Sequence, residues 1–149
     1  MLSSVPAIAP SDTVLASRLR LAVTRLARKL RKEAEPGITP TMLAALSSVE
    51  QAERLTMRDL CAAEQVQPPT MTRVVAAMVE AGLVAREPDP EDGRVVWVRL
   101  TPQGRKLLAR SRRRKEAYLV EELRGLGPRE LDVLEEAAGI LERLTEGRR

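Results

Sequence analysis

The chain has 149 residues and a formal net charge of +4, which fits one domain with a hydrophobic core and not two independent ones. Its single cysteine, Cys61, excludes a disulfide within the chain, and the lack of histidine removes both the commonest zinc ligand and the commonest general base. We therefore expect no cofactor and no bound metal, and an enzyme is the weakest of the functional interpretations.

The N-terminal residues 1–10 are small, apolar and interrupted by proline, which predicts a poorly ordered arm. They lack the charged and continuous apolar regions of a secretory signal, and no segment of the chain is apolar over the length that a bilayer requires. The sequence therefore predicts a cytoplasmic protein without a membrane partner.

Two helices are expected in the first third of the chain. The first runs from Ser11 or Asp12, either of which can cap it, to about residue 33. The second begins with Thr39 as its cap and Pro40 at its first helical position. The apolar residues of the first helix recur at helical spacing and form one stripe: Leu15, Leu19, Ala22, Val23, Leu26 and Leu30.

The middle of the chain predicts two short helices separated by a turn. The first covers residues 57–63 and is capped by Thr56. The second covers residues 69–81, with Met71, Val74, Val75 and Met78 facing inward, and Gly82 ends it in a left-handed conformation.

A β-hairpin is expected directly after these helices. Two β-prone runs, residues 83–86 and 95–100, flank a loop rich in Pro, Asp and Gly. Two short helices across a turn, followed by a hairpin, are typical of a winged helix-turn-helix. We therefore predict a mainly α fold with a small β-hairpin wing.

Two further helices are expected at the C-terminal end. The first is capped by Thr101-Pro102 and runs to about Arg124, and the second runs from Arg129 to about Leu144. Together with the first helix they carry more apolar residues than a small winged module buries, which predicts that two subunits pair across a twofold axis. An intramolecular helical bundle is the alternative. The apolar residues concerned are Leu107, Leu108, Leu119, Val120, Leu123, Leu131, Val133, Leu134, Ile140, Leu141 and Leu144.

The basic residues are concentrated in two runs, residues 18–32 and 99–115, that contain no acidic residue. Runs of this kind indicate a polyanion partner, and solvated helix faces are the alternative interpretation. Most acidic residues of the C-terminal part follow the second run.

Residues 55–104 carry five short motifs in order: Leu60-Cys61-Ala62, Thr70 to Val75, Gly82-Leu83-Val84, Asp89 to Arg94 and Leu100 to Gly104. With these motifs the segment resembles the MarR family of bacterial regulators. The resemblance implies a single domain over 1–149, with a winged helix-turn-helix at about 38–100 inside a frame of dimerisation helices at about 11–33 and 102–146. It also implies a homodimer that binds a near-palindromic operator in double-stranded DNA, often as a repressor that a small anionic ligand releases.

The first turn of the second short helix is the expected DNA-reading element, since helix-turn-helix proteins present this turn to the major groove. Its candidate contacts are Gln67, Pro69, Thr70, Thr72 and Arg73. Gln67 can read adenine, and Arg73 can bind guanine or a phosphate. The alternatives are a capping role for Gln67 and simple helix solubility for Thr70. Pro69 removes a backbone donor, which predicts fewer phosphate contacts from this helix.

The tip of the wing supplies the strongest single candidate, Arg94. A guanidinium on a hairpin tip can enter a narrow A·T minor groove, and Asp92 is expected to orient it through a charge-assisted hydrogen bond. A surface ion pair of little energetic consequence is the alternative. Arg86, at the base of the wing, is expected to contact the DNA backbone or to brace Asp92.

The remaining expectations concern effector binding, the cysteine and the choice of partner. The resemblance implies a ligand pocket between the frame and the winged module, and position suggests Arg18, Leu19, Met42, Leu46 and residues near Tyr118 as its lining. Cys61 is expected to be a packed, inert thiol rather than a redox switch. A winged-helix adaptor that binds proteins and not DNA is the alternative function.

Overall fold

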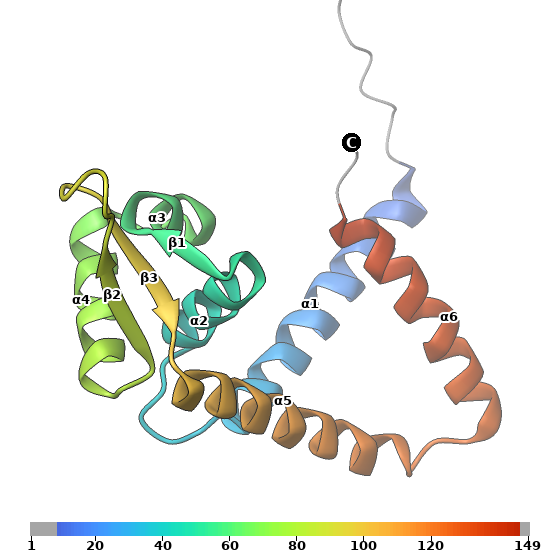
Figure 1. The fold of residues 1–149 in the computed structure, drawn as a ribbon. Coiled ribbons are helices and arrows are strands. Elements are labelled where there is room, and N and C mark those ends of the chain that lie inside the picture. The colour runs from blue at the N-terminus through green and yellow to red at the C-terminus, as the bar shows by residue number, and fades with distance from the viewer. Residues whose placement is uncertain (1–8, 147–149) are drawn as a thin grey trace, which may run out of the picture.

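The structure, a computed structural model, describes residues 9–146 and is mainly helical with a small antiparallel sheet (Figure 1). None of the helices in this part of the chain is long and apolar enough to cross a membrane. The elements are α1 (Pro10–Lys32), α2 (Pro40–Ala52), β1 (Arg54–Thr56), α3 (Met57–Glu64), α4 (Pro68–Glu80), β2 (Val84–Pro88), β3 (Val96–Leu100), α5 (Pro102–Leu123) and α6 (Pro128–Thr145).

The helix boundaries follow local chemistry. Thr39, Thr56 and Thr101 each accept a hydrogen bond from a backbone amide in the first turn of their helix, as predicted. The helix α1 is confirmed, with its end near residue 33, but its predicted cap at Ser11 or Asp12 was wrong, because the helix starts at Pro10 and its N-cap is Ala9 without a side-chain bond. Proline pre-sets the backbone for a first helical position, and Asp12 then lies within the first turn. Of the predicted arm at residues 1–10, residues 1–8 lie outside the described residues, and Pro10 belongs to α1.

The sheet has the strand order β1-β3-β2, with both pairs antiparallel. The predicted hairpin is β2 and β3, in which Arg86 lies opposite Val98 and Glu87 opposite Trp97. The sequence prediction missed β1, which is only three residues long and pairs Thr56 with Trp97. This third strand ties the start of α3 to the wing.

The hydrophobic core lies within one lobe, formed by α2, α3, α4, the sheet and the first turns of α5. The inward face of α4 is confirmed, with Met71, Val75 and Met78 fully buried and Val74 partly buried. Leu107 and Leu108 were predicted to belong to the pairing frame, but they are buried in this core, because the start of α5 packs on the lobe. The buried apolar residues are Met42, Ala45, Leu46, Val49, Leu60, Met71, Val75, Met78, Leu83, Val84, Val98, Leu100, Leu107 and Leu108.

A single junction connects α4, the sheet and α5. The Thr101 hydroxyl donates a hydrogen bond to the Gly82 carbonyl at 2.6 Å and accepts one from the Gly104 amide at 3.0 Å. Gly82 has a φ of +72°, as the left-handed end of the preceding helix requires. A Cβ on Gly104 would lie 2.1 Å from the Leu83 carbonyl oxygen, so only glycine fits this position.

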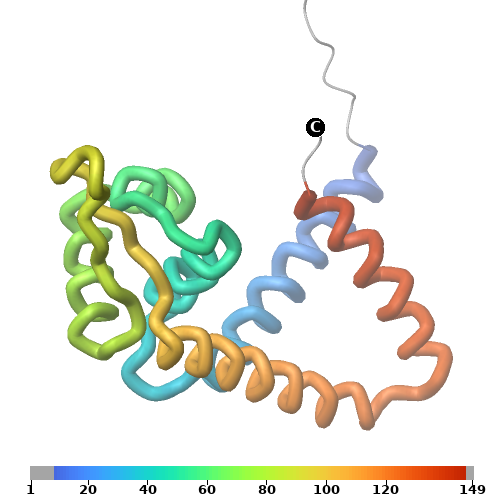
Figure 2. The backbone as a smooth tube through the Cα atoms, viewed as in Figure 1, coloured from blue at the N-terminus to red at the C-terminus, as the bar shows by residue number. Residues whose placement is uncertain are grey.

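Helices α1, α5 and α6 extend beside the lobe as three sides of an open triangle (Figures 1 and 2). No residue of α1 or α6 is buried in the single chain. The predicted alternative of an intramolecular bundle is therefore not the arrangement of the described residues. The exposed large apolar residues of the three helices are Val14, Leu15, Leu19, Leu21, Val23, Leu26, Val120, Leu131, Val133, Leu134, Ile140, Leu141 and Leu144.

Candidate nucleic-acid interface

The first turn of α4, the first turn of α3 and the wing lie at the same end of the lobe, away from α5 (Figure 1). The connectivity explains this arrangement, since β2 starts where α4 ends and runs back toward the start of that helix. A hollow between the start of α3 and the base of the wing is lined by Thr56, Met57, Arg58, Asp59, Arg94, Val95 and Val96. The residues expected to contact DNA on α4 and on the wing therefore belong to one surface.

The first turn of α4 has few backbone donors. Gln67 is the N-cap, and its side chain makes no capping hydrogen bond. The next two residues, Pro68 and Pro69, have no amide hydrogen. The amide of Thr70 is bonded to the Gln67 carbonyl at 3.0 Å. This helix therefore lacks the free N-terminal amides that commonly bind phosphate, and side chains must supply its contacts.

The polar side chains of α4 differ in what they can still bind. Thr70 and Arg73 are exposed, and Arg73 forms no ion pair with any residue in the described part of the chain. The Thr72 hydroxyl donates to the Pro68 carbonyl at 2.8 Å. Its oxygen and methyl group remain available, but its hydrogen is already used. Of this set, Arg73 has the greatest capacity to bind a base or a phosphate.

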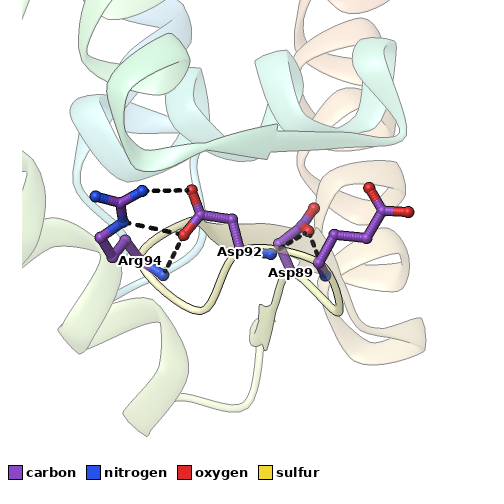
Figure 3. A network of polar contacts seen from close by, with 4 residues as sticks. Asp89, Asp92 and Arg94 are labelled. Atoms are coloured by element: carbon purple, nitrogen blue, oxygen red, sulfur yellow. Dashed lines mark hydrogen bonds and ion pairs between the residues drawn. The ribbon is translucent and has the colours of Figure 1, made fainter.

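The wing tip presents one strongly exposed cation. The Arg94 side chain is 92% exposed, and its Nε and Nη2 donate to the two carboxylate oxygens of Asp92 at 3.1 and 3.4 Å (Figure 3). Asp92 also accepts a hydrogen bond from the Arg94 backbone amide at 3.1 Å. The guanidinium is thus fixed along one edge while Nη1 remains free of these bonds. Arg86 is exposed on β2. The expected alternative in which Arg86 braces Asp92 is not what the structure shows, because the Asp92 carboxylate is bonded to Arg94.

The second carboxylate of the wing, Asp89, is bonded to the sheet and to the backbone of its own loop. Asp89 accepts a hydrogen bond from Trp97 Nε1 at 2.8 Å through Oδ2, and from the amides of Glu91 and Asp92 at 2.9 and 3.1 Å through Oδ1. The bond from Trp97, the two amide bonds and the nearby charge of Arg54 hold the pKa of Asp89 below its ordinary value of 3.8. The loop is therefore organised around an ionised side chain.

Sequence reasoning missed Arg58, which is exposed on α3. Arg58 lines the hollow beside Arg94 and also a second, apolar hollow with Met57, Cys61, Pro68 and Thr72. It therefore lies between the wing and the start of α4. Its position follows from how α3 packs, and no periodicity or motif in the sequence marks it.

Several arginines of the basic run on α5 form ion pairs within the chain. Arg110 Nε pairs with Glu35 at 3.0 Å, Arg114 lies 3.8 Å from the same carboxylate, and Arg112 pairs with Glu50. These ion pairs join α5 to α2 and to the segment after α1. They remove part of the support for the prediction that this run faces a polyanion.

A separate cavity of about 300 Å³ lies between α1, α2 and α5. The Ser111 hydroxyl on its wall is buried and has no hydrogen-bond partner among the described residues. The lining differs from the prediction: Met42 and Leu46 are in the core of the lobe, and Arg18 and Leu19 are exposed on α1. The lining residues are Arg31, Pro40, Leu43, Ala44, Ser47, Leu108, Ser111, Arg112 and Lys115.

Comparison with known proteins agrees with this geometry. The sequence model of the MarR family matches residues 38–96. An uncharacterised HTH-type transcriptional regulator of Mycobacterium leprae is 40% identical over 132 residues, which cover 88% of this chain and 92% of that protein. The chain belongs to the MarR family. It is a DNA-binding transcriptional regulator of the helix-turn-helix type.

Solved structures of MarR-family and related proteins share the whole architecture. A putative transcriptional regulator of Pseudomonas aeruginosa superimposes with a TM-score of 0.84 at 29% identity, covering 94% of this chain and 99% of that one. Wild-type MarR from E. coli, in its apo form, superimposes with a TM-score of 0.74 at 26% identity, covering 91% and 98%. The match extends over the frame helices as well as the winged lobe.

The pKa of Asp89 leads to a prediction for acid conditions. Because the pKa in the folded chain is below that in the unfolded chain, the carboxylate contributes stability that is fully present above pH 3.8 and is lost as the pH falls through the folded value. We expect the indole N–H resonance of Trp97, the only tryptophan, to move over that lower range. The Asp89→Asn variant should lack this transition, and a midpoint above 3.8 would contradict the prediction.

Proposed function

We propose that this MarR-family regulator binds a near-palindromic DNA operator as a homodimer and acts as a repressor. The observation that carries the proposal is the surface formed by the start of α4, Arg58 and the wing tip at Arg94. In a helix-turn-helix dimer, two such surfaces read two half-sites in successive major grooves. Gln67, Thr70 and Arg73 are the candidate major-groove contacts, with Pro69 and Thr72 beside them.

The wing complements a recognition helix that has few phosphate contacts. Arg94, oriented by Asp92, is proposed to enter the minor groove beside each half-site, where a narrow A·T groove attracts guanidinium groups. Arg86 is proposed to contact the backbone at the base of the wing. Arg58 is placed to contact the phosphates between the two grooves.

The homodimer is supported by the unburied faces of α1 and α6. Large apolar side chains on these helices are 37–69% exposed in the single chain. Many exposed large apolar side chains on neighbouring helices are typical of a surface that binds another protein chain. A twofold arrangement of the frame helices brings like faces together and places the two winged lobes on the same side.

Replacing Leu134 on α6, which is 45% exposed, tests the dimer. We expect Leu134→Glu to convert a dimer into monomers in sedimentation experiments, because two charges would be buried across the twofold axis. Val79→Glu is a matched control, since Val79 is 38% exposed on α4, outside the frame. A wild-type chain that sediments as a monomer would overturn this part of the proposal.

Replacing Arg94 tests the role of the wing. Arg94→Ala should weaken operator binding at least about tenfold, since a charge-assisted contact in the minor groove is lost. The melting temperature should stay nearly unchanged, because the side chain is 92% exposed. Arg124→Ala, which removes another exposed arginine in an ion pair, serves as the control in gel-shift titrations. Equal binding by both variants would argue against the assignment.

Selection of bound DNA from a random pool tests the function as a whole. A recovered near-palindrome supports dimeric, sequence-specific binding and gives the spacing of the half-sites. Recovery of no preferred sequence favours the alternative of a winged-helix adaptor that binds proteins. A reporter gene placed behind the recovered site then distinguishes repression from activation.

A second proposed function is the binding of a small anion in the cavity beneath the lobe. Its support is the unpartnered Ser111 hydroxyl, because a buried polar group without a partner is rare in proteins. Arg31 and Lys115 form no ion pair within the described residues, while Arg112 is shared with Glu50. A carboxylate with an apolar body suits this lining, and its binding is proposed to release the operator.

Ser111→Ala tests this cavity with benzoate as the probe. We expect benzoate affinity, measured by calorimetry, to fall about tenfold, since a hydrogen bond to a charged group is lost. The melting temperature should stay equal or rise, because a buried hydroxyl without a partner is removed. Ser48→Ala is the control, since Ser48 bonds to Glu64 outside the cavity. Equal affinity of the two variants would contradict an anion site at Ser111.

A further inference from the structure

The wing loop, residues 89–95, is closed by contacts that do not involve Arg94. Asp89 accepts the indole hydrogen of Trp97 at 2.8 Å and two backbone amides of the loop. The Asp89 amide donates to the Val95 carbonyl at 2.9 Å, which pairs the two ends of the loop. One carboxylate therefore connects the sheet to the backbone on which Asp92 is carried.

The other end of this connection is anchored in the sheet. Trp97 lies on β3, the central strand, opposite Thr56 on β1 and Glu87 on β2. The Arg54 guanidinium lies over its ring, 4.1 Å from the ring centroid, in a cation–π contact. The indole is thus held between a cation on one strand and the hydrogen bond to Asp89.

We propose that Asp89 and Trp97 are positioning residues for Arg94, and that their hydrogen bond holds the wing loop in the DNA-reading conformation before DNA arrives. The inference rests on the proposed role of Arg94 in the minor groove. Neither residue needs to touch DNA for this role. They act on Asp92, whose amide is bonded to Asp89 and whose carboxylate orients the guanidinium of Arg94.

The physical reason is the backbone freedom that glycine gives to the tip of the loop. Gly93 next to Arg94 has no side chain to pack, and a Cβ there would meet nothing within 4 Å. A loop of this kind has to be ordered when it binds, and ordering it in advance improves affinity without any new contact. Asp89, like an ordinary aspartate, is ionised at neutral pH, and its charge strengthens the hydrogen bonds that it accepts.

The decisive variants are Trp97→Phe and Asp89→Asn. Phenylalanine keeps an aromatic face for Arg54 but has no N–H, and asparagine keeps one acceptor for the loop amides but presents an amino group to the indole. Each variant should lower affinity for the selected operator about three- to tenfold, with the melting temperature nearly unchanged. Glu91→Gln is the matched control, since it removes a charge from the same loop, where only its backbone amide bonds to Asp89.

A double-mutant cycle separates positioning from general stability. If the hydrogen bond acts through Arg94, Trp97→Phe has no further effect on operator affinity in the Arg94→Ala background. Two operators, with A·T or with G·C pairs beside the half-sites, give a second readout. The ratio of the wild-type affinities for these two operators should become smaller in Trp97→Phe, whereas a merely structural role would weaken binding to both equally. Additive losses or an unchanged ratio would overturn the proposal.

Hydrogen exchange without DNA tests the hydrogen bond independently of the proposed function. The amides of Glu91 and Asp92 should exchange faster in both variants than in the wild type and in Glu91→Gln. Unchanged exchange rates overturn the proposal. Failure of the proposed function would be seen in a different experiment: the Arg94→Ala variant would bind the operator as tightly as the wild type.

Discussion

The hydrogen bonds of the Thr101 side chain position the winged lobe relative to the frame. Its hydroxyl donates to Gly82, directly after α4, and accepts from Gly104 at the start of α5. One side chain therefore joins the end of the recognition helix, the end of β3 and the first turn of the long frame helix. Gly104 makes the close approach possible, since any Cβ there would collide with the Leu83 carbonyl. This junction, together with Leu107 and Leu108 in the core that also contains the inward face of α4, fixes α4 relative to the start of α5.

The two parts of the molecule differ in how complete they are in a single chain. The lobe buries its apolar side chains, whereas α1 and α6 bury none. Between them, Glu35 and Glu50 pair with arginines of α5, and the cavity with Ser111 opens at the same place. A ligand there would contact both parts, because Arg112 belongs to the cavity and to the ion pair with Glu50. The proposed release of the operator by a ligand in the cavity would act through this shared arginine.

The candidate DNA surface compensates for a recognition helix with an unusual start. Pro68 and Pro69 stiffen the first turn of α4 but remove its free amides, so guanidinium groups have to supply the charged contacts. Arg73 on the helix, Arg58 on α3 and Arg94 on the wing are the residues proposed to provide them, and they lie on three different elements. Of these three arginines, Arg94 is held by the most contacts: Asp92 orients its guanidinium, and the Asp89–Trp97 hydrogen bond closes the loop that carries it.

The sequence by itself determined the features that depend on neighbouring residues. The caps at Thr56 and Thr101, the left-handed Gly82 and the pairing of Asp92 with Arg94 involve residues at most three positions apart, or a single backbone conformation. These local signals were sufficient to predict the helices, the hairpin and the winged helix-turn-helix.

Only the tertiary structure decided which distant residues meet. The strand β1 is too short for a periodic pattern, and it forms because β3 offers it hydrogen bonds. Leu107 and Leu108 have the same apolar character and spacing as residues of the frame, yet they belong to the lobe because the start of α5 packs there. The pairing of Arg110 with Glu35 joins residues 75 positions apart, and the place of Arg58 beside the wing depends on packing between elements. Contacts of this kind leave no local signal in the sequence, because they depend on how the elements pack and not on their own composition.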